Sequence, residues 1–252
     1  MKRSLLTFFI VLCSGIALLQ AQESSASAGS LDERFVAANQ ALSDGQFQPA
    51  IDGYTALLAE SPSATVYYNL GNAYYRDGQY GRAILQYERC LVLNPDNADA
   101  RANLKLAQDA AQVDPPARTW YENYAQAAGV NTWTWLAVVS FWGAAFLIVL
   151  PPLFRWRSPW RPLLLTLCVI GLGVSGTGLA GYHFMSQEGI VLTDDAPLKL
   201  APTSTSPAKS FLHAGQPADI KKTHGDYAYV VTATGEQGWM SSDVFAPIWD
   251  MR

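Results

Sequence analysis

Residues 67–95 have the sequence YYNLGNAYYRDGQYGRAILQYERCLVLNP. Apolar and small residues recur in it every three or four positions, a spacing that places them on one face of an α-helix. Asp77-Gly78 divides the stretch into two helical segments, because glycine adopts the left-handed conformation that ends a helix. Asn94-Pro95 ends the second segment, since proline cannot continue a helix. The stretch therefore predicts a helix–turn–helix hairpin.

The sequence of the hairpin occurs twice in the chain. DGQFQPA begins at Asp44 and DGQYGRA begins at Asp77, so the same turn-and-helix phrase recurs after the length of one hairpin. The second copy resembles the tetratricopeptide repeat, a pair of helices with small and aromatic residues at fixed positions over roughly 34 residues. The residues that carry the resemblance, with Cys90 at a position where the family has alanine, are Tyr67, Leu70, Gly71, Tyr74, Ala83, Tyr87 and Pro95.

The first copy, residues 31–63, matches the pattern more loosely, and residues 98–112 resemble the solitary helix that caps such arrays. We therefore expect residues 31–112 to be all-α: two tetratricopeptide hairpins and a capping helix. Because arrays usually need about three repeats for stability, we expect this one to lean on a partner, another copy or the membrane edge.

The resemblance implies a scaffold whose first helices display a groove that binds peptides or proteins. Asparagine amides both donate and accept hydrogen bonds, so they suit an extended peptide backbone. Asn39 and Asn72 occupy the same place in the two copies, but Phe35 and Tyr68 stand where carboxylate-clamping repeats have lysine. The alternative is that these asparagines only lie on solvent-exposed helix faces and bind nothing. The predicted groove consists of Phe35, Asn39, Leu42, Tyr68, Asn69, Asn72, Tyr75 and Asn103.

The N-terminus has the pattern of a secretory signal peptide. Lys2 and Arg3 precede an apolar stretch, and a polar stretch follows Ala21. Residues 1–21 are therefore predicted to be cleaved. An uncleaved anchor is one alternative. Lipidation at Cys13 is another, although Leu12 stands where a small residue is expected.

Two long apolar runs, residues 132–154 and 163–184, contain no charged residue. Each has the roughly 20 residues that a membrane helix needs. The intervening loop, residues 155–162, holds three arginines and no acid, which is typical of a cytoplasmic loop. Residues 113–131 are predicted to link the repeats to the first span. The alternative is a buried hairpin in a soluble protein, but tryptophans at the ends of the runs favour membrane spans.

The signal peptide and the spans predict one topology. Both termini lie on the outer side of the cytoplasmic membrane of a bacterium, in the periplasm, and only 155–162 stays inside. The chain carries a net charge of −4, and both external segments are acidic, so nucleic acid is not an expected partner. Glycines between Gly171 and Gly181 predict close helix packing, either with the first span or with another membrane protein.

Residues 187–248 alternate short apolar runs with turn residues, which predicts a small antiparallel β domain. The segment resembles bacterial SH3-like domains, since it has a Leu-x-Leu strand at 198–200 and a closing Gly-x-x-Gly-Trp motif made of Gly235, Gly238 and Trp239. The resemblance implies a small barrel. Trp239 is interpreted as structural, with ligand binding as the alternative.

No catalytic arrangement is visible in the sequence. The histidines, His183, His213 and His224, are scattered, and no nucleophile–base pair, phosphate loop or metal-ligand spacing occurs. The three cysteines suggest no disulfide framework. We therefore expect a protein that is not an enzyme and has no cofactor and no metal.

The order of signal, repeats, two spans and SH3-like domain resembles the BatE-type proteins of the bacterial aerotolerance operon. That resemblance implies a non-enzymatic membrane scaffold that works beside von Willebrand A-type membrane proteins and a MoxR-type ATPase, in oxidative or envelope stress. The alternative is a cell-wall-binding protein, whose tail holds peptidoglycan while the repeats recruit a wall enzyme.

Overall fold

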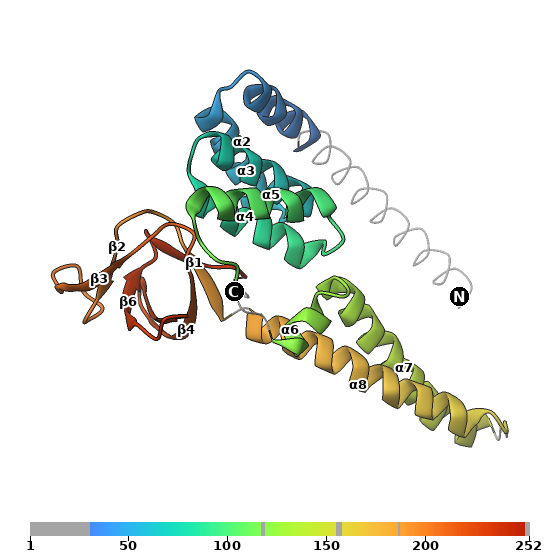
Figure 1. Ribbon diagram of the computed structural model, residues 1–252. Helices are drawn as coiled ribbons and strands as arrows, with labels where there is room; N and C mark the ends of the chain where they lie inside the picture. The colour runs from blue at the N-terminus through green and yellow to red at the C-terminus, as the bar shows by residue number, and fades with distance from the viewer. Residues whose placement is uncertain (1–30, 117–118, 155–157, 186, 250–252) are drawn as a thin grey trace, which may run out of the picture. The chain divides into compact units, whose positions relative to one another are not determined.

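The computed structural model describes residues 31–116, 119–154, 158–185 and 187–249 (Figure 1). The predicted signal peptide and part of the predicted loop 155–162 lie outside the described residues. The chain divides into two compact units, Met1–Pro62 and Ser63–Arg252.

The described part of the first unit is a helical hairpin. A helix over residues 31–43 is followed by α2 (Phe47–Glu60), and Gly45, with φ +75°, allows the sharp turn between them. A Cβ added at Gly53 would lie 3.1 Å from the Ala38 Cβ, so the two helices touch at small residues. Tyr54 of α2 is fully buried in this contact. The prediction of a helical first copy is confirmed.

The second unit begins with three helices, α3 (Ala64–Arg76), α4 (Tyr80–Leu93) and α5 (Ala98–Ala111). Gly78, with φ +78°, turns the chain between α3 and α4. A Cβ added at Gly71 would lie 2.6 Å from Tyr87 Cε1, so the absence of a side chain there lets the fully buried Tyr87 ring fit between the helices. Asn97 caps α5 by accepting a hydrogen bond from the Ala100 amide (2.9 Å).

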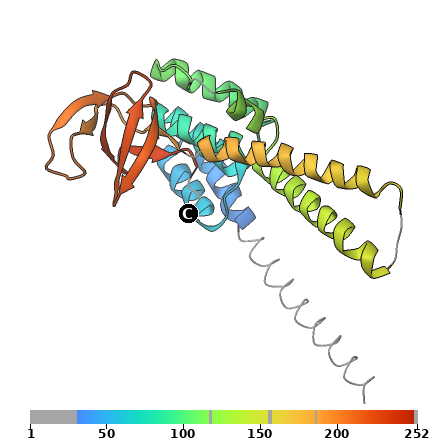
Figure 2. The same ribbon diagram turned by 90° about the horizontal axis from the view of Figure 1, so that it is seen from below.

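Two long helices follow, α7 (Val130–Phe154) and α8 (Arg161–Met185), and they lie side by side in both views (Figures 1 and 2). Residues Val130–Pro151 and Arg161–Met185 have mean hydropathies of 1.9 and 2.0, so both helices are long and apolar enough to cross a membrane. Most of the exposed large apolar side chains among the described residues lie on this pair.

The predicted linker contains a further short helix, α6 (Trp120–Ala125), which starts with a capping box formed by Thr119 and Glu122. It packs on the end of α8, where a Cβ at Gly181 would lie 2.6 Å from the Ala125 Cβ. Trp133 of α7 donates its indole N–H to the Ala125 carbonyl oxygen (2.8 Å). The α6 segment is therefore fixed against the long helices.

The C-terminal segment forms one antiparallel sheet in the order β3-β2-β6-β5-β4-β1-β7. Its buried side chains come from several strands and include Val191, Leu198, Val230 and Met240. The strands are β1 (Glu188–Val191), β2 (Ala196–Lys199), β3 (Ala208–Leu212), β4 (Pro217–His224), β5 (Tyr227–Thr232), β6 (Gln237–Ser241) and β7 (Phe245–Pro247).

The sheet is not closed, so the prediction of a barrel is wrong. Closure would require the two edge strands, β3 and β7, to pair. The C-terminal end of β7 instead bonds to a helix. Pro247 has no backbone N–H to donate, and the carbonyl oxygens of Pro247 and Ile248 accept hydrogen bonds from Arg89 of α4 (3.0 and 3.1 Å). The last strand is therefore held by a helix instead of by the first hairpin of the sheet.

The same contact explains how a short repeat array is completed. Ile190 and Ile248 belong to the core that contains Ile84 and Leu85 of α4. A Cβ at Gly81 would lie 2.6 Å from the Val191 carbonyl oxygen, so α4 lies directly against β1. In a longer array, a further repeat would cover the apolar surface of the last hairpin. Here the chain's own sheet and the ends of α6, α7 and α8 cover that surface.

Candidate protein-binding face

An amide network ties the three helices of the second unit together. Asn72 Oδ1 accepts a hydrogen bond from the Tyr87 hydroxyl (2.8 Å) and another from Asn103 Nδ2 (2.9 Å). The same Asn103 nitrogen lies 3.3 Å from the Tyr68 hydroxyl. Side chains of α3, α4 and α5 thus meet at one amide oxygen, with half-buried Tyr68 and Asn103 beside it.

The first copy repeats part of this arrangement within its own unit. Asn39 Oδ1 accepts a hydrogen bond from the Tyr54 hydroxyl (2.7 Å), and the donor follows the acceptor by 15 residues, as Tyr87 follows Asn72. Burial raises the pKa of Tyr54 to about 12, and burial is also the largest cause of the raised pKa of Tyr87. Burial thus favours the protonated form that each hydroxyl needs in order to donate.

Asn39 and Asn72 are therefore engaged inside the protein, and not only with solvent or a bound peptide. Their carbonyl oxygens hold the second helix of each repeat, so a peptide meets amides that are already part of an internal network. The sequence contained the signal, because the same Asn-to-Tyr spacing occurs in both copies.

The remaining predicted groove residues are half-buried. Phe35 packs 6.1 Å from Tyr54, and Tyr75 packs 5.6 Å from Tyr80, both measured between ring centroids. Leu42 and Asn69 are also half-buried. The two copies belong to different compact units, so Phe35, Asn39 and Leu42 lie in one unit and the other five predicted residues lie in the second.

Sequence reasoning missed Leu106. It follows Asn103 by three positions on α5, so both side chains lie on one face of the helix, and 52% of its surface is exposed. An exposed leucine beside a polar and aromatic network is typical of a surface that binds protein. We call Tyr68, Asn72, Tyr75, Asn103 and Leu106 the repeat face.

The residues predicted to shape the second repeat lie as follows. Leu70, Ala83, Tyr87 and Pro95 are buried. Tyr67 and Tyr74 are half-buried, and each has an arginine guanidinium near its ring: Arg89 at 6.0 Å from Tyr67 and Arg82 at 5.9 Å from Tyr74. Cys90 is buried, which raises the pKa of its thiol to about 11.

In the tail, Gly235 (φ +82°) lies in the turn before β6. A Cβ at Gly238 would lie 2.7 Å from Leu198 Cγ, so this glycine lets β2 and β6 approach. Trp239 is half-buried in the next position. It pairs across the sheet with Tyr229 on one side and Lys199 on the other, and Tyr229 pairs with Lys222. We call Lys222, Tyr229, Trp239 and Lys199 the lysine–aromatic row.

The row is held together by ring contacts. The Tyr229 and Trp239 centroids are 5.3 Å apart, and Lys222 Nζ lies 4.9 and 5.1 Å from them. Such cross-strand contacts stabilise a sheet, and they also leave aromatic rings at a partly exposed surface. Within the described part of the chain, no three His, Cys, Asp or Glu side chains gather as a metal site.

A comparison with protein families agrees with the geometry of α3 and α4. Residues 64–97 match the family model of the tetratricopeptide repeat. The match covers one copy of the repeat and ends at the residue that caps α5. A repeat of this kind indicates protein–protein binding.

Proposed function

We propose that this protein is a membrane-anchored, non-enzymatic adaptor whose repeats bind partner proteins. The tetratricopeptide match over α3 and α4 carries the proposal. The repeat face supports it, because its polar groups are fixed by the Asn72 network and its apolar contact, Leu106, is exposed. A pre-organised surface loses little conformational entropy when a partner binds.

The anchor in this proposal is the α7–α8 pair. Leucines, valines and large aromatic side chains cover its outer surface, and lipid is the solvent that suits them. We propose that the pair spans the bacterial cytoplasmic membrane, with the repeats and the sheet on the periplasmic side. The arginine-rich loop supports this orientation.

The assembly that fits this architecture is an aerotolerance or envelope-stress complex. The order of repeats, paired apolar helices and β tail resembles that of BatE-type proteins, although the tail of this chain is an open sheet. We propose that the partners are von Willebrand A-type membrane proteins that work with a MoxR-type ATPase.

The decisive experiment compares two variants of α5 in the full-length protein. Leu106→Glu places a carboxylate on the repeat face, and Lys105→Glu places one at the preceding, also exposed position, where it changes the net charge by two units instead of one. Both variants are isolated from native membranes in mild detergent, together with whatever membrane proteins remain bound. We expect Leu106→Glu to reduce capture of von Willebrand A-type partners about tenfold or more and Lys105→Glu to leave it unchanged.

Equal thermal unfolding of the two variants shows that folding is not the cause. If both variants capture the same partners as the unmodified protein, the repeat face is not the binding surface. If the captured set contains no von Willebrand A-type protein, the proposed complex is wrong even though the adaptor role stands.

The lysine–aromatic row favours a second candidate, in which the SH3-like tail binds peptidoglycan. Aromatic rings stack on sugar rings, and lysines attract carboxylates. The test is sedimentation of the detergent-solubilised full-length protein with purified cell wall. The second candidate predicts that the protein sediments, that Trp239→Ala and Lys222→Gln reduce the bound fraction several-fold, and that Phe211→Ala does not. A protein that stays wholly in solution excludes it.

A further inference from the structure

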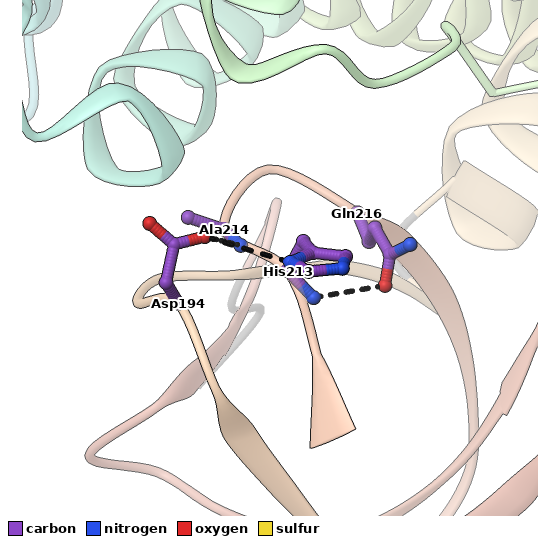
Figure 3. Close-up of polar contacts among 4 residues, drawn as sticks. All are labelled: Asp194, His213, Ala214 and Gln216. Atoms are coloured by element: carbon purple, nitrogen blue, oxygen red, sulfur yellow. Dashed lines mark hydrogen bonds and ion pairs between the residues drawn. The ribbon is translucent and has the colours of Figure 1, made fainter. Parts of the chain in front are cut away.

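A cleft of about 720 Å³ lies within the second unit, between the repeat and the sheet. One wall is the turn from α3 to α4 together with the C-terminal end of α5. The other wall is the loop after β1 and the turn between β3 and β4, which Figure 3 shows around His213. Its volume is in the range of binding pockets, which often form where two parts of a protein meet.

Two glycines allow the walls to approach. Gly215 has φ +87°, and a Cβ there would lie 2.7 Å from Ile84 Cδ1. Gly81, on the facing helix, has the Gly215 amide nitrogen 2.9 Å from the position of its absent Cβ. The base of the cleft is thus closely packed backbone. The repeat and the sheet together fix the position of the polar residues that line it.

The acidic group that lines the cleft already has partners. Asp194 Oδ1 accepts a hydrogen bond from the Ala214 amide (3.0 Å) and lies 3.9 Å from His213 Nδ1 (Figure 3). Gln216 Oε1 accepts a hydrogen bond from the His213 amide (3.1 Å). These contacts hold the β3–β4 turn in shape and engage one oxygen of the lining's carboxylate within that turn.

The cation of the lining has no such partner. Arg82 lies over the Tyr74 ring at 5.9 Å, and no carboxylate of the described residues lies within ion-pair distance of its guanidinium. The first turn of α4, on which Arg82 lies, contains no acidic residue. An arginine on an aromatic ring keeps its fork of N–H donors for a planar anion.

We propose that this cleft binds an extended segment of a partner protein and that Arg82 holds an acidic side chain of that segment. Charge complementarity selects this ligand, because Asp194 is bonded within its own turn, whereas no carboxylate of the described residues pairs with the Arg82 guanidinium. Gln79 Nε2 already donates to Asp77 and Gln216 Oε1 already accepts from His213. The Gln112 amide, the Gln79 oxygen and the Gln216 nitrogen are the groups that can bond to an extended main chain. The proposal deepens the adaptor function, on which it rests, by adding a second contact surface that joins the repeat to the sheet.

The probe is a random heptapeptide display library, selected on the full-length protein in detergent micelles and depleted on the Arg82→Gln variant. We expect the enriched peptides to share an aspartate or glutamate at one position. In fluorescence anisotropy, their affinity should fall about tenfold or more for Arg82→Gln. Replacing the shared carboxylate by its amide should give the same loss. Arg82→Lys should retain part of the affinity.

Leu106→Glu separates this proposal from the adaptor function. We expect it to leave the affinity for the selected peptides unchanged while it releases the native partner. Failure to enrich peptides over the Arg82→Gln target, or enrichment of peptides without a shared carboxylate, overturns the cleft proposal and leaves the repeat face standing. Peptides that bind Arg82→Gln and the unmodified protein equally overturn it too.

Discussion

Tyr87→Ala is expected to cost the second unit about 3–5 kcal/mol of its free energy of unfolding, the usual cost of removing a large buried aromatic side chain. Tyr87 is fully buried, and its ring fills the space that Gly71 leaves between α3 and α4. Its hydroxyl also holds Asn72. The measurement is urea unfolding of the purified full-length protein in detergent, followed by circular dichroism.

Two matched variants separate the causes. Tyr87→Phe keeps the ring and loses only the hydrogen bond, so it should cost about 0.5–1.5 kcal/mol, and Asn103 still donates to Asn72. Tyr80→Ala removes a half-buried tyrosine of the same helix and should cost less than Tyr87→Ala. If Tyr87→Ala and Tyr80→Ala destabilise the protein equally, the contact between Tyr87 and Gly71 does not hold the repeat together.

The helical hairpin of the repeat could be predicted from the sequence, but the contacts between its helices could not. The recurrence of the DGQ phrase and the Gly78 turn fix the hairpin, because both depend on local sequence. The network at Asn72 was missed, since it joins residues on α3, α4 and α5. Helical periodicity assigns a residue to a face of its own helix, and it does not say which helix packs on that face.

The second buried face of α4 illustrates the same limit. Ile84, Leu85 and Val92 are all buried, so apolar positions occur around much of the helix circumference. A helix that is apolar on more than one side must be covered on more than one side. The sequence therefore contained a sign of a second packing partner. Its identity, the C-terminal strand held by Arg89, depends on a contact between parts of the chain that lie far apart in sequence.

The tail shows a correct local prediction and a wrong global one. The Gly-x-x-Gly-Trp motif forms the β5–β6 turn and the start of β6, as its turn residues indicate. Closure into a barrel is not a local property. It depends on whether the first and last strands of the sheet meet, and the carbonyl oxygens at the end of β7 bond to Arg89 instead.

The glycines of α8 fall into two groups that the sequence did not distinguish. A Cβ at Gly178 would lie 2.5 Å from the Trp133 ring, so this glycine faces α7. Gly171 faces Ser140 of α7 in the same way, and Gly181 faces α6. Gly173 and Gly176 have no neighbour within 4 Å of an added Cβ. Gly171 and Gly178 therefore show close packing on α7, which is one of the two alternatives that the sequence left open.

This division predicts opposite results for the same substitution at neighbouring sites. Gly178→Leu drives a side chain into Trp133, and overpacking of this kind costs about 1–3 kcal/mol, so α7 and α8 should separate. Gly176→Leu points into open space and should leave the pair intact. A disulfide reports the packing, because a Cβ at Gly143 would lie 3.2 Å from Cys168 Sγ.

In a Gly143→Cys, Cys13→Ser background, we expect a membrane-permeant oxidant to link the new thiol to Cys168 rapidly. Cys90 should not compete, because it is buried and its pKa of about 11 keeps the thiol protonated. Adding Gly178→Leu should slow disulfide formation about tenfold or more, whereas adding Gly176→Leu should not. Equal rates would contradict the packing of Gly178 on Trp133. Slow formation with Gly176→Leu alone would mean that another molecule in the membrane covers the outer face of α8.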